Sequence, residues 1–170
     1  MQTILVPLDG SHFGEAILAT VAKLARPLGA TVELFSVGRL DQAHQTSVAY
    51  GNREPIPAAA PSGTRLNVPL LNEVLPPVAE SRGQALSRIE AELRAYLHGC
   101  AHELEGVDTE ITVDIADDPA AVIIDHARHR HVDLIAMATH GRTGLSHLLA
   151  GSVCEHVIRS GVAPVVVLRP

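Results

Sequence analysis

The chain has 170 residues, enough to bury the core of one domain without disulfides or a structural metal. Hydrophobic residues make up 46% of it and aromatic residues only 2%, so the core must consist of aliphatic side chains. The formal net charge of -6 argues against nonspecific nucleic-acid binding, which requires a basic surface.

The N-terminus and the cysteines favour a cytoplasmic protein. The opening sequence MQTILVPLDG is interrupted too early for a signal peptide, and no apolar run approaches the roughly 20 residues that span a membrane. Cys100 and Cys154 lie among apolar neighbours in helical patterns. This predicts small buried side chains in a reducing compartment.

The first half of the chain predicts two strands, one helix and a long insertion. Residues 3–8 and 31–37 are β-branched runs typical of strands. Between them, an apolar stripe over 17–28 predicts a helix that Ser11 could cap. Residues 39–82 hold six prolines and break the pattern, which indicates a Pro-rich insertion in a single domain over 1–170. Such a loop is either without fixed structure or partly ordered over a site or a partner.

The second half continues the alternation of helices and strands. Asp118 followed by Pro119 is typical of a helix start, and Gly161 is typical of a helix end. In chain order we predict a helix over 86–104, a strand over 109–115, a helix over 118–128, a strand over 132–138, a helix over 152–160 and a strand over 163–168.

Strict alternation predicts an α/β fold, a three-layer doubly wound parallel sheet of five strands with right-handed crossovers. Three of the runs, TILVPL, DLIAMA and APVVVL, are apolar on both faces, as expected of strands covered by helices on both sides. Pro164 cannot donate to a strand ladder, so the last strand is predicted at an edge.

In such sheets, ligands bind at the carboxyl ends of strands where the winding direction reverses. The most unusual strand end is the segment 137–153, in which three glycines separate an apolar strand from a helix. Glycines let backbone N–H groups approach a phosphate, and a helix N-terminus attracts an anion. The segment contains neither a P-loop nor a dinucleotide fingerprint. On residue types alone, it is either an anion site or an ordinary loop.

The glycine spacing in this segment is specific. Nine residues separate Gly141 from Gly151, and Ser152 follows. This resembles the ATP-binding signature of universal stress proteins, G-x2-G-x9-G-[S/T], except that Ala138 stands at its first glycine. The opening ILVPLDGS and the close GSVCEHVIRSGVAPVVVLRP are also similar to that family. The resemblance covers nearly the whole chain except 39–82.

The resemblance implies a strand order of 3-2-1-4-5 and the adenine nucleotide alpha hydrolase-like fold. It also implies a site for ATP or another adenine nucleotide. Whether Mg²⁺ binds with the nucleotide stays open. For the adenosine end it implies contacts from Asp9 to the ribose or base, from Pro7, Leu8 and Val37 to the base, and a floor of Met137 and Ala138. For the phosphates it implies Gly141, Gly151, Ser152 and Val153, to which Arg142 could add a charged contact.

The resemblance further implies a regulatory module in the stress response and a homodimer paired through the edge strand 163–168. Two alternatives stay open. A nucleotide-free dimeric interaction protein, with 39–82 as partner surface, is favoured by Ala138. A very slow ATPase is the other, because the phosphate loop has no lysine and no general base is evident.

Two further patterns are interpreted as structural. The tract from His126 to His131 lies late in a helix with two arginines, which predicts a solvated polar face rather than a metal site. Asp117 and Asp118 are better explained as a helix cap than as a catalytic pair.

Overall fold

A computed structural model describes residues 2–39, 81–139 and 153–169. The predicted insertion therefore lies almost wholly outside the described residues, and so does most of the predicted phosphate loop. No helix in the described ranges is long and apolar enough to cross a bilayer.

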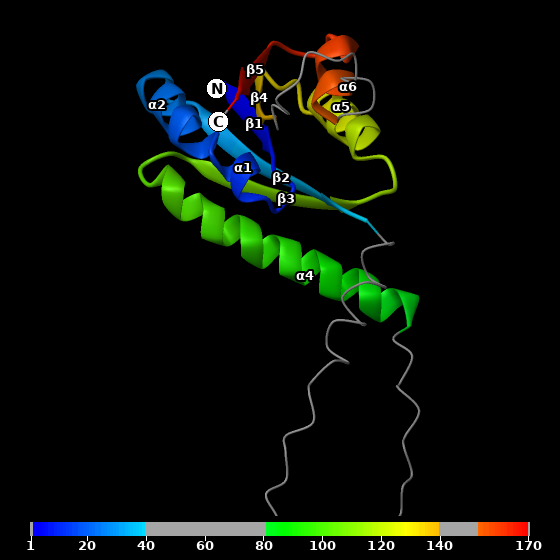
Figure 1. The fold of residues 1–170 in the computed structure, drawn as a ribbon. Coiled ribbons are helices and arrows are strands. Elements are labelled where there is room, and N and C mark those ends of the chain that lie inside the picture. The colour runs from blue at the N-terminus through cyan, green and yellow to red at the C-terminus, as the bar shows by residue number, and fades with distance from the viewer. Residues whose placement is uncertain (1, 40–80, 140–152, 170) are drawn as a thin grey trace, which may run out of the picture.

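The described residues form a parallel five-stranded sheet with helices on both faces (Figure 1). The strands are β1 (Thr3–Pro7), β2 (Thr31–Gly38), β3 (Thr109–Ile115), β4 (Leu134–Ala138) and β5 (Val165–Leu168). The helices are α1 (His12–Glu15), α2 (Leu18–Leu28), α4 (Arg82–Ala101), the 3-10 turn η1 (His102–Leu104), α5 (Pro119–His129) and α6 (Val153–Ser160). The strand order β3-β2-β1-β4-β5 confirms the predicted fold class and order.

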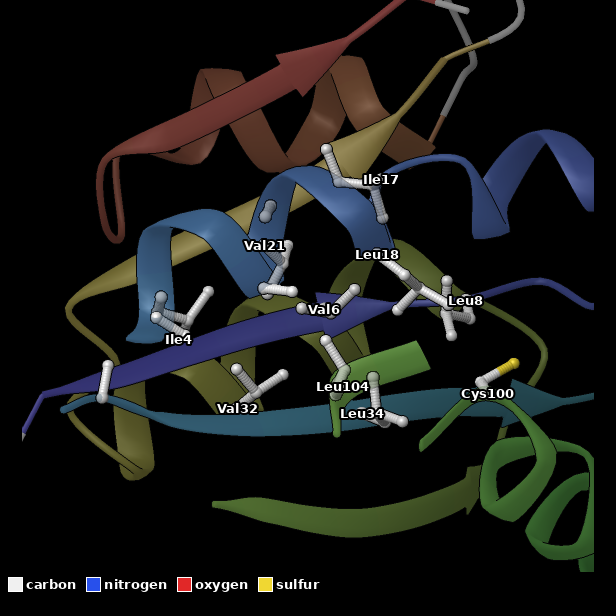
Figure 2. Close-up of a cluster of buried hydrophobic side chains, with 14 of the residues drawn as sticks. Ile4, Val6, Leu8, Ile17, Leu18, Val21, Val32, Leu34, Cys100 and Leu104 are labelled. Atoms are coloured by element: carbon white, nitrogen blue, oxygen red, sulfur yellow. The ribbon is translucent and has the colours of Figure 1, made fainter. Parts of the chain in front are cut away.

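Each face of the sheet carries its own aliphatic core. On the α2–α4 face, side chains of β1 and β2 pack against α2, η1 and the end of α4, as Figure 2 shows for Ile4, Val6, Val32 and Leu34 among others. On the α5–α6 face, Leu5 and Ile135 pack against α5 and α6. β1 and β2 are therefore buried on both sides, which explains their continuous apolar sequence.

Local signals define most helix ends. Asp118 caps α5 by accepting from the N–H groups of Ala120 and Ala121 at 3.1 and 3.2 Å, so the cap interpretation is confirmed. Gly29 and Gly161 end α2 and α6 with φ of 57° and 61°, the left-handed conformation that glycine adopts readily. α4 begins with a capping box between Ser81 and Gln84.

The helix start after β1 differs from the prediction. Ser11 caps the short helix α1, and a separate helix, α2, carries the predicted stripe. The two are separated because Ala16 and Ile17 donate to carbonyls three residues back, at 3.3 and 3.4 Å. The helix predicted over 86–104 also tightens into η1 for its last residues.

The last two strands are shorter than predicted. The Val132 N–H bonds to the Ala127 carbonyl at the end of α5, so β4 starts only at Leu134. Pro164 lies just before β5 and accepts from Ile135 through its carbonyl. β5 is an edge strand of the described sheet, as predicted.

Candidate functional site

The carboxyl ends of β1 and β4 lie side by side at the point where the sheet reverses its winding. β1 pairs with β2 on one side and β4 on the other. The register aligns Leu5 with Ile135, so Pro7 and Met137, each two residues further along, lie at the same level. This is the position at which open α/β sheets bind ligands.

A hydrogen-bonded turn holds Asp9 directly after β1. Its Oδ1 accepts from the Ser11 N–H at 3.0 Å and the Ser11 hydroxyl at 2.6 Å. The same hydroxyl accepts from the Gly14 N–H at 3.0 Å, and Gly10 makes the turn with φ of 80°. Within the described residues, Asp9 Oδ2 has no hydrogen-bond partner. The turn therefore fixes one carboxylate oxygen and leaves the other available.

Gly14 is packed tightly against this turn. A Cβ at residue 14 would lie 2.9 Å from Asp9 Oδ1 and 3.4 Å from Ser11 Oγ. Since real Cβ atoms hardly ever come this close, the absence of a side chain allows α1 to approach the carboxylate. The turn engages only one oxygen of the Asp9 side chain, so the predicted ligand contact can involve the other.

Leu8 and Ala138 belong to the α2–α4 face of the site. Leu8 is only 4% exposed, and its N–H donates to the Phe35 carbonyl at 2.8 Å. Its carbonyl accepts from the Ser36 hydroxyl at 2.9 Å. The Ala138 methyl group packs, partly buried, against the same core cluster. The backbone at the end of β1 is therefore fixed by β2.

The other described residues of the predicted site lie on the α5–α6 face or at its rim. Val37, Met137 and Val153 pack in or against the core cluster of that face. Pro7 is half-buried at the end of β1. Gly141, Arg142, Gly151 and Ser152 lie outside the described residues, so their phosphate contacts stay predictions.

Sequence reasoning missed a buried acidic network under α5. Glu33, on β2, is only 1% exposed. Its Oε1 accepts from the Thr112 hydroxyl at 2.6 Å and lies 2.8 Å from His126 Nε2, while Oε2 lies 3.7 Å from Arg130 Nε. A single carboxylate within the apolar run of β2 was the available signal, since buried charges are usually paired.

This network corrects the prediction of a solvated face for His126. The side chain is 20% exposed, and its ring stacks on Phe35 with centroids 4.5 Å apart. α5 turns this histidine toward the sheet, where it bonds to Glu33, while His129 stays exposed. Among the described residues, no group of three or more His, Cys, Asp or Glu is arranged to hold a metal ion.

Both cysteines are buried and free, as expected. Burial raises the pKa of the Cys100 thiol and of the Cys154 thiol above their ordinary value. Because the thiolate is the reactive form, neither cysteine has the properties of a nucleophile.

Comparison with known proteins identifies the family. The sequence model of the universal stress protein family matches residues 1–169. The universal stress proteins MJ0531 and MJ0577 of Methanocaldococcus jannaschii are 32% identical over 100 residues and 30% identical over 93 residues. These matches cover 59% and 54% of this chain but only 51% and 57% of the relatives, so the chain spans about half their length. The stress response protein NhaX of Bacillus subtilis is 26% identical over 168 residues, 98% of this chain and 96% of its own.

Solved structures share the fold. The structure of MJ0577 superimposes with a TM-score of 0.65 at 22% identity, covering 99% of this chain and 96% of its own. A universal stress protein solved in complex with cAMP gives a TM-score of 0.62 at 16% identity, covering 99% and 96%. Since the family's sequence model spans nearly the whole chain and the strand order agrees, this protein belongs to the universal stress protein family.

Proposed function

We propose that this protein is a regulatory module of the stress response that binds ATP or another adenine nucleotide at the carboxyl ends of β1 and β4. The observation that carries the proposal is the pairing of β1 with β4 at the winding reversal, with the Asp9 carboxylate directly after β1. The carboxylate oxygen that the described residues leave unbonded is suited to accept hydrogen bonds from ribose hydroxyls or an adenine amino group.

The proposed ligand contacts come from both strand ends and from the loop before α6. Pro7, Asp9, Val37, Met137 and Ala138 would surround the adenosine, with Leu8 as buried support, and Gly141, Arg142, Gly151, Ser152 and Val153 would bind the phosphates. Two findings support this arrangement. α6 begins at Val153, so its positive N-terminus follows the phosphate loop. A structural relative of low identity was solved with cAMP, which is an adenine nucleotide.

The proposal is tested on the purified full chain. Protein is denatured and the supernatant is analysed for adenine nucleotides by mass spectrometry. Thermal unfolding is then followed with ATP, ADP and AMP, each with and without Mg²⁺. A nucleotide at about 100 times its dissociation constant should stabilise the protein by roughly 2.7 kcal/mol.

Two variants separate the two ends of the proposed site. Asp9→Asn keeps an oxygen that can accept from Ser11 but removes the charge, so it should weaken nucleotide binding about tenfold without unfolding the turn. Gly151→Val should abolish the thermal shift while the circular dichroism spectrum stays unchanged. Wild-type affinity in both variants would contradict the proposed site.

A nucleotide-free interaction protein is the second candidate, and Ala138 at the first signature glycine favours it. Absence of released nucleotide, together with no thermal shift at millimolar ATP, would select this function.

In either case we propose that the protein is cytoplasmic and that residues 1–170 form one domain with an insertion at 39–82. We also propose a homodimer that pairs through residues 163–168. ATP hydrolysis, if measured, should be very slow, since no lysine lies in the phosphate loop.

A further inference from the structure

A groove separates α1 and the start of α2 from the C-terminal half of α4. Its volume is about 520 Å³, within the range of small-molecule sites. None of the described residues that are predicted to bind nucleotide lines it. The apolar wall is formed by Leu18 and Ala19, and the opposite side by Tyr96 and Cys100. The groove is thus a second concavity, separate from the strand ends.

The polar groups of the groove are mostly acceptors of hydrogen bonds. Glu15 and Glu103 lie along it, one from each side. The Tyr96 hydroxyl oxygen is buried and makes no hydrogen bond of good geometry among the described residues, although Cys100 and Glu15 lie close to it. A buried polar atom without a partner is costly, so such an atom beside a concavity points to a missing partner.

The electrostatic environment of the groove disfavours anions. Burial is the main cause that raises the pKa of the Tyr96 hydroxyl, and the nearby Cys100 and Glu15 raise this pKa further. Burial is also the main cause that raises the pKa of the Cys100 thiol. The neighbouring Tyr96 hydroxyl lowers this pKa in part, and the charges of Glu15 and Glu103 raise it. Both side chains therefore stay neutral, and the two carboxylates give the groove a negative potential that attracts a cation.

We propose that this groove binds a small primary alkylammonium ion. Its N–H groups would donate to the Tyr96 hydroxyl oxygen and to the carboxylates of Glu15 and Glu103, while the ring of Tyr96 offers a cation–π contact. The alkyl chain would pack on the apolar wall. His12 lies 3.0 Å from Glu15, but its side chain is 98% exposed, so an ammonium ion can compete for that carboxylate.

The chemistry of the groove favours an organic cation over a metal ion. In the part of the chain that the structure describes, no cluster of His, Cys, Asp and Glu is suited to hold a metal. A metal ion would also leave the apolar wall unused. An amine with a short alkyl chain uses the carboxylates, the hydroxyl and the wall together.

The experiment is a titration of the full-length protein with n-butylammonium chloride, followed by amide proton–nitrogen correlation spectra. n-Butanol is titrated in parallel as the neutral ligand of similar shape. Saturable shifts should be confined to amides of residues 12–19 and 96–103, and butylammonium should bind at least about tenfold more tightly than butanol. Equal affinity for the alcohol, or shifts located elsewhere, would overturn the proposal.

Gly99 provides a variant that fills the groove. A Cβ at this position meets no atom within 4 Å, and the residue lines the groove. Gly99→Leu should therefore abolish amine binding while the protein stays folded. Gly83, on the same helix but outside the groove, also has open space, so Gly83→Leu is the matched control and should bind as the wild type does.

A second pair of variants tests the charge. Glu15→Gln together with Glu103→Gln should weaken butylammonium binding about tenfold and leave butanol binding unchanged. Unchanged ammonium affinity in this double variant, or in Gly99→Leu, would refute the site. Because no nucleotide is added in these titrations and the shifts are read at residues 12–19 and 96–103, their outcome is independent of the nucleotide proposal.

Discussion

At the residue scale, Gly14 connects the sequence to the candidate site most directly. It belongs to α1, where alanine would normally be preferred over glycine by about 1 kcal/mol. Here, however, a Cβ would lie 2.9 Å from Asp9 Oδ1. The close approach of the α1 backbone to the Asp9 carboxylate, rather than helix propensity, therefore requires glycine at this position.

We predict that Gly14→Ala displaces the Asp9 carboxylate and weakens nucleotide binding about tenfold or more. The measurement is a nucleotide titration followed by the thermal unfolding midpoint. Gly99→Ala is the control, because open space at that helical position should give about 0.5–1 kcal/mol of stabilisation and unchanged nucleotide affinity. Full nucleotide affinity in Gly14→Ala would show that the Asp9 turn is not part of the site.

The second prediction at this scale concerns the Glu33–His126 pair. His126→Leu removes one partner of a carboxylate that is 1% exposed, which should cost about 2–3 kcal/mol of unfolding free energy, measured in urea. Combining it with Glu33→Met removes both polar groups and should cost less than the sum of the single changes. Strict additivity would mean that the two side chains are not coupled.

At the scale of elements, α4 is positioned by a glycine at the end of β2. A Cβ at Gly38 would lie 2.6 Å from Ile89 Cγ2 and 3.0 Å from Leu93 Cδ1. The side chains of Ile89 and Leu93 form a separate small cluster with those of Ala85 and Ile115. The N-terminal half of α4 is therefore held to the sheet by close packing at one backbone position.

We predict that Gly38→Ala destabilises the protein by about 1–3 kcal/mol through overpacking. Ile89→Ala removes the clashing methyl group, so the double variant should be more stable than the sum of the two single losses predicts. Chemical denaturation of all four proteins measures this coupling. A coupling energy of zero would indicate that α4 can shift away from β2 without cost.

Helix boundaries differ in how far the sequence could predict them. The start of α5 and the end of α6 depend on local residues, Asp118 with Pro119 and Gly161, and both were predicted. The break between α1 and α2 was not, because it depends on Ala16 and Ile17 bonding to carbonyls three residues back rather than on the apolar period. Ser11 was expected to cap the helix that carries the apolar stripe, but it caps α1, and α2 begins after Ile17 without a side-chain cap.

At the scale of the whole molecule, alternation predicted the doubly wound parallel sheet, and the family resemblance predicted its strand order. The site was predictable only in part. Asp9 and Met137 were placed correctly at neighbouring strand ends, since topology alone determines that. The contacts of Glu33 could not be predicted, because they join residues 79 and 93 positions apart through tertiary packing. The groove beside Tyr96 likewise depends on how α4 lies against α1.

The proposed homodimer is tested at this scale. Val167 lies on the edge strand β5 and is 40% exposed, so a lysine there would be solvated in a monomer but would oppose strand pairing between two copies. We predict that Val167→Lys sediments as a monomer. Leu28→Lys, at a 56% exposed position on α2, is the control and should leave the dimer intact. A dimeric Val167→Lys protein would locate the interface elsewhere.

The central position of β1 has a consequence for how the protein is made. Of the five strands described, β1 is synthesised first, and it gains β2 as a neighbour after residues 31–38. Its other neighbour, β4, is synthesised much later. The Thr3 N–H, for example, donates to Oδ2 of Asp133, just before β4 and 130 residues further along the chain. On the ribosome, one edge of this apolar strand therefore stays unpaired until residues 134–138 have emerged. Such late closure is slow and exposes a strand edge, so newly made chains should depend on chaperones for their yield.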